Sequence, residues 1–303
     1  MGSQSSKPSE PSVDTNESYK SARNVLEDIG KGIKDRASRD AKRHRNVLKG
    51  NLRDAKFYHE YSKYRTVPES PCDLNFWFHT NVWHGKAEDR NPCAGRNKNR
   101  FSNESEAECY NSKITGNEGK IGACAPYRRR ELCDYNLEHI DVNNVKSIHD
   151  LLGNLLVMAR SEGESIVNSH KNTGMINVCA SLARSFADIG DIVRGKDLFL
   201  GNNDNDKIKK EKLRGNLEKI FEKIKTSNTN MNTLSLDKVR EYWWALNRED
   251  VWKALTCSAP YEAYYFTYKS DKFRKFSSDR CGHNEGDPPT NLDYVPQFLR
   301  WFD

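Results

Sequence analysis

Apolar residues recur every three or four positions along the second half of the chain, which is the spacing of an amphipathic helix. The spacing predicts four helices, over about residues 142–159, 176–187, 213–224 and 236–246, with a break near Gly190 after the second. Alternating apolar and polar runs, which are typical of strands, are nearly absent. The pattern therefore predicts a helical bundle. Its expected core contains Leu152, Leu155, Ala183, Phe186, Leu217, Phe221, Trp243 and Leu246.

A further helix is predicted within residues 18–65, where apolar residues recur every four positions. We expect this stripe to dock the helix on the rest of the molecule; it consists of Val25, Ile29, Ile33, Ala37 and Ala41. Gly30 and Gly32 interrupt the segment, and each weakens a helix by roughly 1 kcal/mol relative to Ala. Pro68 and Pro71 mark its end, because a proline disfavours helix at the residue before it.

The remaining segments divide the chain into four parts. Residues 1–17 are rich in Ser, Pro and Glu and are predicted to be disordered. Residues 18–71 form the helical segment. Residues 72–140 lack a sustained period and hold five of the eight cysteines, which predicts a loop-rich region tied by disulfides. Residues 141–303 form the predicted bundle.

Composition alone does not decide in which cellular compartment the protein resides. No run of 18 apolar residues is present, so we expect no segment that spans a membrane. The N-terminus lacks the apolar stretch of a secretory signal, which by itself favours a cytosolic protein. The even number of cysteines argues for an oxidising environment instead.

Positive charge is concentrated near the N-terminus. The whole chain carries a net charge of +6, whereas residues 31–56 contain ten Lys and Arg against three Asp, a net of +7. So few acids cannot pair so many bases, which favours an acidic partner such as a sulfated glycan, a nucleic acid or an anionic membrane surface. Residues 207–225 carry eight basic and three acidic residues, interleaved as on a solvated helix face.

No pattern of catalytic or metal-binding residues stands out. The chain has no Cys-x-x-Cys pair, and its cysteine spacings match no zinc module. Gly116–Lys120 lacks the spacing and the Ser or Thr of a phosphate-binding loop. We therefore expect no enzyme activity, no cofactor and no metal. Trp243, Trp244 and Trp252 follow helical spacing, which favours core packing over a ligand-stacking platform.

Three ordered blocks carry a family resemblance. They are Phe186–Phe199, which reads FADIGDIVRGKDLF, Tyr242–Cys257, which begins YWWALNREDVW, and Asn291–Phe302, which reads NLDYVPQFLRWF. Together they resemble the Duffy-binding-like domains of malaria parasites, and in particular the N-terminal segment and first alpha-type domain of the Plasmodium falciparum erythrocyte membrane protein 1 family. The resemblance runs from about residue 1 to the end, and it implies a third subdomain beyond residue 303.

The resemblance implies a mainly α Duffy-binding-like fold and an adhesin without catalytic chemistry. It implies rosetting or cytoadherence through heparan sulfate-like glycans, blood-group sugars or complement receptor 1. The expected location is the surface of the infected erythrocyte, reached without a conventional N-terminal signal and anchored by a later segment. The alternative is an intracellular nucleic-acid-binding protein that uses residues 31–56. It would need reduced cysteines and has no recognisable nucleic-acid-binding motif.

The resemblance also implies disulfides. It pairs Cys93 with Cys133 and Cys109 with Cys124, around a block that reads CAPYRRRELC. It favours Cys179–Cys281, while Cys257–Cys281 would close a shorter loop, and the pairing of Cys72 stays open.

The basic helix is the expected anchor for a sulfated glycan. The candidate residues for binding a glycan or receptor are Lys34, Lys42, Arg43, Arg45, Lys49, Arg96, Lys98, Arg100, Arg128, Arg129 and Arg130.

Overall fold

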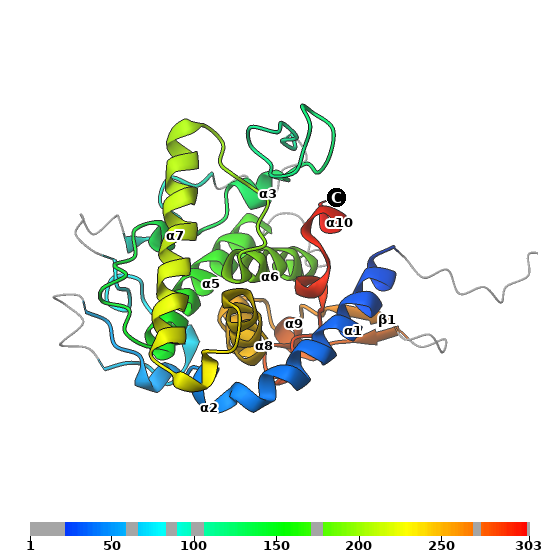
Figure 1. Ribbon diagram of the computed structural model, residues 1–303. Helices are drawn as coiled ribbons and strands as arrows, with labels where there is room; N and C mark the ends of the chain where they lie inside the picture. The colour runs from blue at the N-terminus through cyan, green and yellow to red at the C-terminus, as the bar shows by residue number, and fades with distance from the viewer. Residues whose placement is uncertain are drawn as a thin grey trace, which may run out of the picture.

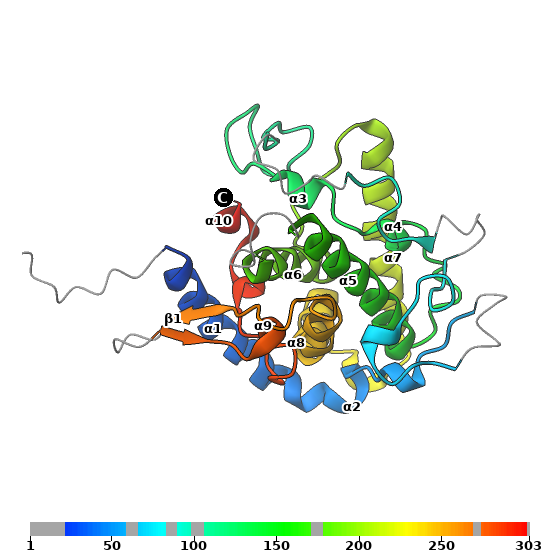
Figure 2. The same cartoon turned by 180° about the vertical axis from the view of Figure 1, so that it is seen from behind.

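The protein is mainly helical in the computed structural model, which describes residues 22–58, 66–82, 90–97, 106–170, 178–268 and 274–301. Its four longest helices after the N-terminal segment are α5 (Ile148–His170), α6 (Val178–Arg194), α7 (Asp204–Thr226) and α8 (Leu236–Leu255). In both Figure 1 and Figure 2, α5, α6 and α8 occupy the centre, with α7 on one side and the N-terminal helix α1 (Ala22–Ala41) on the other. Residues 1–17 lie outside the described residues.

Close helix crossings bring the central helices together. A Cβ atom at Gly163 of α5 would lie 1.8 Å from the carbonyl oxygen of Leu255, so only glycine permits α8 to end against α5 at this distance. Gly190 of α6 lies beneath the Trp244 ring, which a Cβ would approach to 2.8 Å. The predicted break near Gly190 is therefore wrong, because α6 continues to Arg194 and uses the missing side chain for packing.

The core contains the residues that helical spacing selects. Leu152, Leu155, Ala183, Phe186, Leu217, Phe221 and Trp243 are all buried, while Leu246 is partly buried and packs against the core. Trp244 and Trp252 are buried as well, which confirms their structural role. Phe186 lies 5.2 Å from both of these rings, measured between ring centroids. Such tilted and edge-on aromatic contacts stabilise a core beyond the area they bury.

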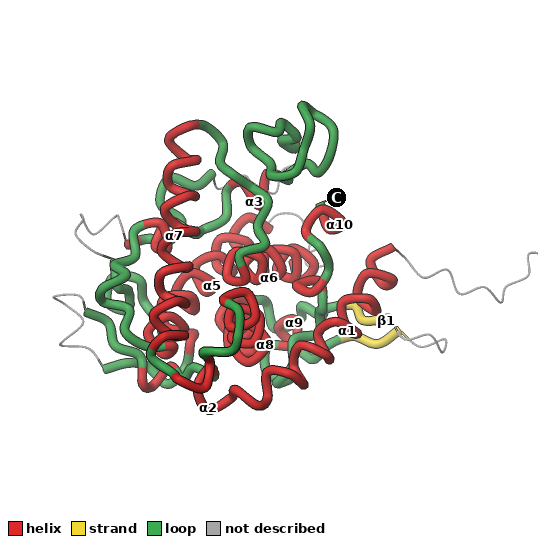
Figure 3. Tube along the Cα trace, in the orientation of Figure 1, coloured by secondary structure: helices red, strands yellow, loops and turns green. Residues whose placement is uncertain are grey.

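Short elements connect and cover the long helices (Figure 3). They are the 3-10 turns η1 (Lys42–His44), η2 (Leu52–Asp54), η4 (Pro71–Asp73), η7 (Thr229–Met231) and η8 (Leu292–Tyr294), and the helices α2 (Arg45–Leu48), α3 (Tyr127–Arg130), α4 (Tyr135–Glu138), α9 (Asp279–Gly282) and α10 (Gln297–Arg300). The antiparallel strands β1 (Phe266–Tyr268) and β2 (Arg274–Phe276) form one hairpin, in which Phe266 pairs with Phe276.

Four disulfides pair all eight cysteines. Three join the pairs that the resemblance implies, Cys93–Cys133, Cys109–Cys124 and Cys179–Cys281. The fourth joins Cys72 to Cys257 across 185 positions of sequence, so the alternative pair Cys257–Cys281 is wrong.

One main hydrophobic core contains residues drawn from most of the chain, the first being Ala41 and the last Val295. It includes Leu74, Leu132 and Leu137 of the loop-rich region. Among the described helices, none is both long and apolar enough to cross a membrane.

Candidate functional site at the end of the N-terminal helix

Helix α1 docks on the molecule through polar groups spaced along one face. The Arg23 guanidinium donates to the Phe266 carbonyl oxygen at 2.7 Å. The Glu27 carboxylate accepts hydrogen bonds from the Tyr265 hydroxyl, the Thr290 hydroxyl and the Asn291 backbone N–H, at 2.6, 2.7 and 2.6 Å. Burial raises the pKa of Glu27, although these three donors each act to lower it.

A close backbone contact completes this docking face. A Cβ atom at Gly30 would lie 2.2 Å from the Asn291 carbonyl oxygen, so α1 can approach η8 only where it lacks a side chain. The expectation that Val25, Ile29 and Ile33 dock the helix is therefore wrong. Their exposed fractions are 42%, 49% and 43%, because another face of α1, which carries Glu27 and Gly30, meets the molecule. Ala41 of the same predicted stripe is buried in the core and Ala37 packs against it, so the stripe docks only at its C-terminal end.

The chain after α1 is clamped onto α8. Asn247 donates to the Leu48 carbonyl oxygen at 2.9 Å and accepts from the Gly50 N–H at 2.7 Å. His44 stacks on the Tyr242 ring, with 5.4 Å between centroids and 12° between planes. These contacts fix the orientation of η1 and α2.

The clamp leaves a group of cations exposed at the surface. Lys42, Arg43 and Arg45 are exposed and form no ion pair within the described part of the chain. Arg36 and Arg39, also exposed, precede them at the end of α1. We call these five residues the distal basic surface. Ten helical residues span only about 15 Å, so their charges lie within reach of one polyanion.

Two other predicted cations of this segment serve docking instead. The Lys34 ammonium pairs with the Asp287 carboxylate at 2.8 Å, and the Lys49 ammonium pairs with the Asp250 carboxylate at 2.5 Å. Both contacts hold the N-terminal segment to residues more than 200 positions away. Neither side chain is therefore an uncommitted charge.

Among the predicted cations of the loop-rich region that the structure describes, Arg128 and Arg129 are buried, and Arg96 and Arg130 are partly buried. Arg96 pairs with Asp134 and Glu138, both at 2.7 Å, and Arg129 donates twice to the Asp197 carboxylate, at 2.9 and 2.5 Å. Arg128 is also buried.

Arg128 and Arg129 are buried and cannot reach a ligand at the surface, and the Arg96 guanidinium is already bound to two carboxylates, so we leave all three out of the proposed binding surface. Arg130 is partly exposed and donates to Asn202 at 2.6 Å. Lys98 and Arg100 lie outside the described residues.

Arg96 and Arg129 belong to a buried network of charged side chains around Asp134. Lys210 of α7 donates to both Asp134 and Glu138, at 2.7–2.8 Å, beside the Arg96 guanidinium. Burial alone would raise the pKa of Asp134, but Lys210, Arg96 and Arg129 together hold it well below its usual range. The network therefore attaches α7 to the loop-rich region, including α4, through charged side chains.

Sequence reasoning missed Lys238 as a neighbour of the distal basic surface. Its ammonium lies 5.8 Å from the centroid of Tyr242, the same ring on which His44 stacks. Helical spacing on α8 places Lys238 and Tyr242 on one face. Only the fold shows that this face receives η1.

The described residues contain no cluster of three His, Cys, Asp or Glu side chains that could hold a metal ion. What the site offers chemically is fixed positive charge. Planar guanidinium groups bind the oxygens of sulfate or phosphate in pairs, and ammonium groups add point charge.

Two family models match the chain. The Duffy binding domain model matches residues 122–300, and the model for the N-terminal segments of PfEMP1 matches residues 21–56. No curated protein matches it.

Several solved structures are similar. One contains the NTS-DBL1-alpha and CIDR-gamma double domain of PfEMP1 from the Plasmodium falciparum varO strain, with a TM-score of 0.84 and 48% identity over 94% of this chain and 43% of that chain. The NTS-DBL1(alpha-1) domain from the same strain gives 0.76 and 47% over 95% of this chain and 61% of that chain.

A PfEMP1 DBLβ domain bound to human ICAM-1 gives a TM-score of 0.71 and 26% identity, over 91% of this chain and 60% of that chain. The present chain spans less than two thirds of the length of each of these structures.

Proposed function

Because this chain belongs to the Duffy-binding-like domains of the Plasmodium falciparum PfEMP1 family, we propose that it is a host-cell adhesion module for the erythrocyte surface. Its proposed role is cytoadherence or rosetting rather than catalysis. The proposed location is the surface of the infected erythrocyte, as part of a membrane-anchored protein. Four disulfides support an extracellular setting, since such bonds persist in oxidising compartments.

The proposed ligand of the distal basic surface is a sulfated glycan of the heparan sulfate type. The observation that carries this proposal is the exposure of Lys42, Arg43 and Arg45 without ion-pair partners among the described residues. Unpaired cations on a fixed scaffold attract a polyanion without first breaking internal contacts. A blood-group sugar, being neutral, would gain no long-range attraction from these charges.

Related domains differ in what they bind. The DBLβ domain that this chain resembles was solved bound to human ICAM-1, a protein receptor. A nucleic acid is the alternative polyanion for the distal basic surface. The four disulfides disfavour it, because an intracellular environment keeps cysteines reduced.

Heparin affinity chromatography of the full chain tests the proposal. Changing Lys42, Arg43 and Arg45 together to Ala should lower the salt concentration at which the protein elutes. Each lost contact reduces the slope of log affinity against log salt by somewhat less than one unit, so the triple variant should lose about two units. Its melting temperature should stay unchanged, because exposed charges contribute little to folding.

The matched control changes Lys207, Lys212 and Lys219 of α7, which are also exposed, to Ala. It removes the same net charge from another surface, so any effect of overall charge appears in both variants. Equal elution of the Lys42, Arg43 and Arg45 variant and the parent would contradict the proposal. A larger effect of the α7 control would move the anchor to residues 207–225.

A further inference from the structure

A small pocket lies where the hairpin of β1 and β2 meets the first turns of α1 and α6. Figure 1 and Figure 2 both place this hairpin beside the start of α1. The pocket has a volume of about 200 Å³, below the range of sites for drug-sized ligands, and therefore suits a small chemical group. We call it the hairpin pocket. Its lining includes Arg23, Glu262, Tyr264, Tyr265, Phe266 and Phe276.

Aromatic rings form most of this lining, and two of them are open to solvent. Tyr264 and Phe276 have exposed fractions of 46% and 50%. Phe266 meets Phe276 edge-on, with 5.4 Å between ring centroids and 61° between planes. The faces of aromatic rings attract cations, and rings gathered in one pocket favour a quaternary ammonium in particular.

The hairpin pocket also carries one charge of each sign. Glu262 is exposed and forms no ion pair in the described part of the chain. The Arg23 guanidinium lies over the Tyr265 and Phe266 rings, at 5.1 and 5.7 Å from their centroids. Its hydrogen bond to the Phe266 carbonyl oxygen uses only part of its N–H groups, so the others remain for a ligand.

This combination favours a zwitterion over a simple ion. A lone cation, such as a lysine side chain, would suit the rings and Glu262 but would place a like charge beside Arg23. A lone phosphate or sulfate would suit Arg23 but would meet the Glu262 carboxylate and the negative faces of the rings. A phosphocholine group carries a phosphate and a trimethylammonium a few bonds apart, and it provides a partner for both charges.

The wall of the hairpin pocket is fixed by covalent and hydrogen bonds. Cys179 in the wall is joined to Cys281, whose N–H donates to the Ala263 carbonyl oxygen at 2.6 Å. The Tyr265 N–H donates to the Ser277 hydroxyl oxygen at 2.8 Å. The rings are thus held in place before any ligand arrives, which lowers the entropy lost on binding.

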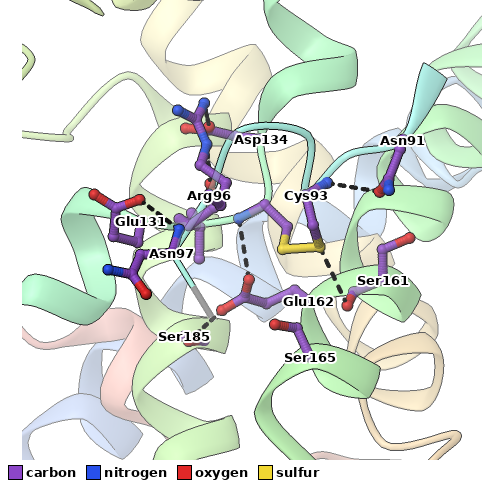
Figure 4. The surroundings of a disulfide bond; sticks show 12 residues. Asn91, Cys93, Arg96, Asn97, Glu131, Asp134, Ser161, Glu162, Ser165 and Ser185 are labelled. Atoms are coloured by element: carbon purple, nitrogen blue, oxygen red, sulfur yellow. Dashed lines mark hydrogen bonds and ion pairs between the residues drawn. A yellow bond between two sulfur atoms is a disulfide. The ribbon is translucent and has the colours of Figure 1, made fainter. Parts of the chain in front are cut away.

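A larger pocket, between α5 and the loop of residues 91–97, lacks these features. Its volume is about 590 Å³, and Phe76 is the one aromatic residue in its described lining. Its cation, Arg96, is already bound to Asp134 and Glu138, and Figure 4 shows the contact with Asp134. Of these two pockets, only the hairpin pocket combines several rings with a guanidinium that has no carboxylate partner among the described residues.

We propose that the hairpin pocket binds a phosphocholine group. The trimethylammonium end lies against Tyr264 and Phe276 beside Glu262, and the phosphate accepts hydrogen bonds from Arg23. Phosphatidylcholine carries this group as its headgroup, and soluble phosphocholine carries it as well, so the pocket recognises what the two share. The inference goes beyond the proposed function and uses no residue of the distal basic surface.

Isothermal titration calorimetry of the full chain with small probes tests the hairpin pocket. We expect phosphocholine to bind more tightly than choline, which lacks the phosphate, and more tightly than phosphoethanolamine, which lacks the methyl groups. Inorganic phosphate should bind more weakly than any of these at this pocket, since it has no cation for the rings. Absence of phosphocholine binding, or choline binding as tightly as phosphocholine, would overturn the proposal.

A second experiment distinguishes the lipid from the soluble source. Vesicles of phosphatidylcholine alone have no net charge, so they do not attract the distal basic surface. Co-sedimentation with these vesicles, reversed by soluble phosphocholine, would identify the lipid headgroup as the source. Binding of soluble phosphocholine without co-sedimentation would identify a soluble ester. Both results support the hairpin pocket as a phosphocholine site.

Two variants and one control locate the binding. Changing Tyr264 and Phe276 together to Leu keeps apolar side chains but removes the ring faces, so the affinity for phosphocholine should fall by about tenfold. Tyr261→Leu, at an exposed tyrosine outside the described lining, is the matched control and should leave the affinity unchanged. Glu262→Gln, at an exposed position, should weaken binding severalfold even if the aromatic variant folds poorly.

The two proposals fail separately. Unchanged affinity for phosphocholine in both the aromatic variant and Glu262→Gln would overturn the hairpin pocket. Heparin retention of the aromatic variant should equal that of the parent, because that variant removes no charge. The variant with Ala at Lys42, Arg43 and Arg45 should in turn bind phosphocholine as the parent does, whatever its retention on heparin.

Discussion

Several charged residues inside this protein are paired, and some of the pairs join segments that are distant in sequence. Asp134 accepts hydrogen bonds from Arg96 and Lys210, which are 38 and 76 positions away. Buried charges are tolerated when they are paired in this way, and removing one partner leaves the other unbalanced in a low-dielectric interior. The network therefore contributes to stability only while Asp134 is ionised.

The first prediction concerns Asp134→Asn. Because the folded pKa of Asp134 lies below its unfolded value of about 3.9, its contribution is present above that value and is lost as the pH falls toward the folded pKa. Urea unfolding at pH 7 should show the variant less stable by about 3–5 kcal/mol. Between pH 5 and pH 2 the difference between parent and variant should shrink. A difference that stays constant over this range would contradict the assignment.

At the scale of elements, α1 shows that an apolar stripe need not face the core. Val25, Ile29 and Ile33 point outward, while Glu27 and Gly30 meet η8 and the segment before it. The docking face is specified by hydrogen-bond partners, by the absence of a side chain at Gly30, and by Leu26, Ala37 and Ala41, which pack in or against the core. Apolar spacing predicts that α1 is a helix, and it does not predict which side docks.

The second prediction contrasts the two faces of α1. Changing Ile29 and Ile33 together to Gln should lower the free energy of unfolding by only about 0.5 kcal/mol, as for exposed positions. Glu27→Ala should lower it by about 1–3 kcal/mol, because the Tyr265 hydroxyl, Thr290 hydroxyl and Asn291 N–H lose their acceptor. Thermal and urea unfolding of both variants provide the measurement. A larger loss of stability in the Ile29 and Ile33 variant than in Glu27→Ala would instead identify the apolar stripe as the docking face.

At the scale of the whole molecule, long-range links hold the loop-rich region to the helices. The Cys72–Cys257 disulfide joins the region at η4 to the end of α8, across 185 positions. The Cys109–Cys124 disulfide closes a local loop of 15 positions. In the chain-entropy account, the longer loop restricts the unfolded chain more.

The third prediction compares the removal of these two disulfides. Changing Cys72 and Cys257 to Ala should lower the free energy of unfolding by about 5 kcal/mol, against about 3 kcal/mol for Cys109 and Cys124. Each variant retains three disulfides, so one is a control for the other. Denaturant unfolding without reductant gives the comparison. A smaller effect for the longer loop would show that strain or residual structure outweighs chain entropy.

The sequence by itself determined the local features of this protein. Helical spacing selected the four long helices and almost all of the tested core, including Trp243 and Phe221, because periodicity records which positions turn inward along one helix. The ordered blocks identified the family, and the family implied three of the four disulfides. These features depend on neighbours within a few turns or on motifs shared with relatives.

Only the tertiary structure decided which face of α1 docks, where Cys72 pairs and which cations remain exposed. Lys42 and Arg129 look alike in sequence, yet one is at the surface and the other donates to Asp197 in the interior. Whether each side chain is exposed or buried depends on partners that lie far along the chain, and the local sequence pattern does not indicate such partners.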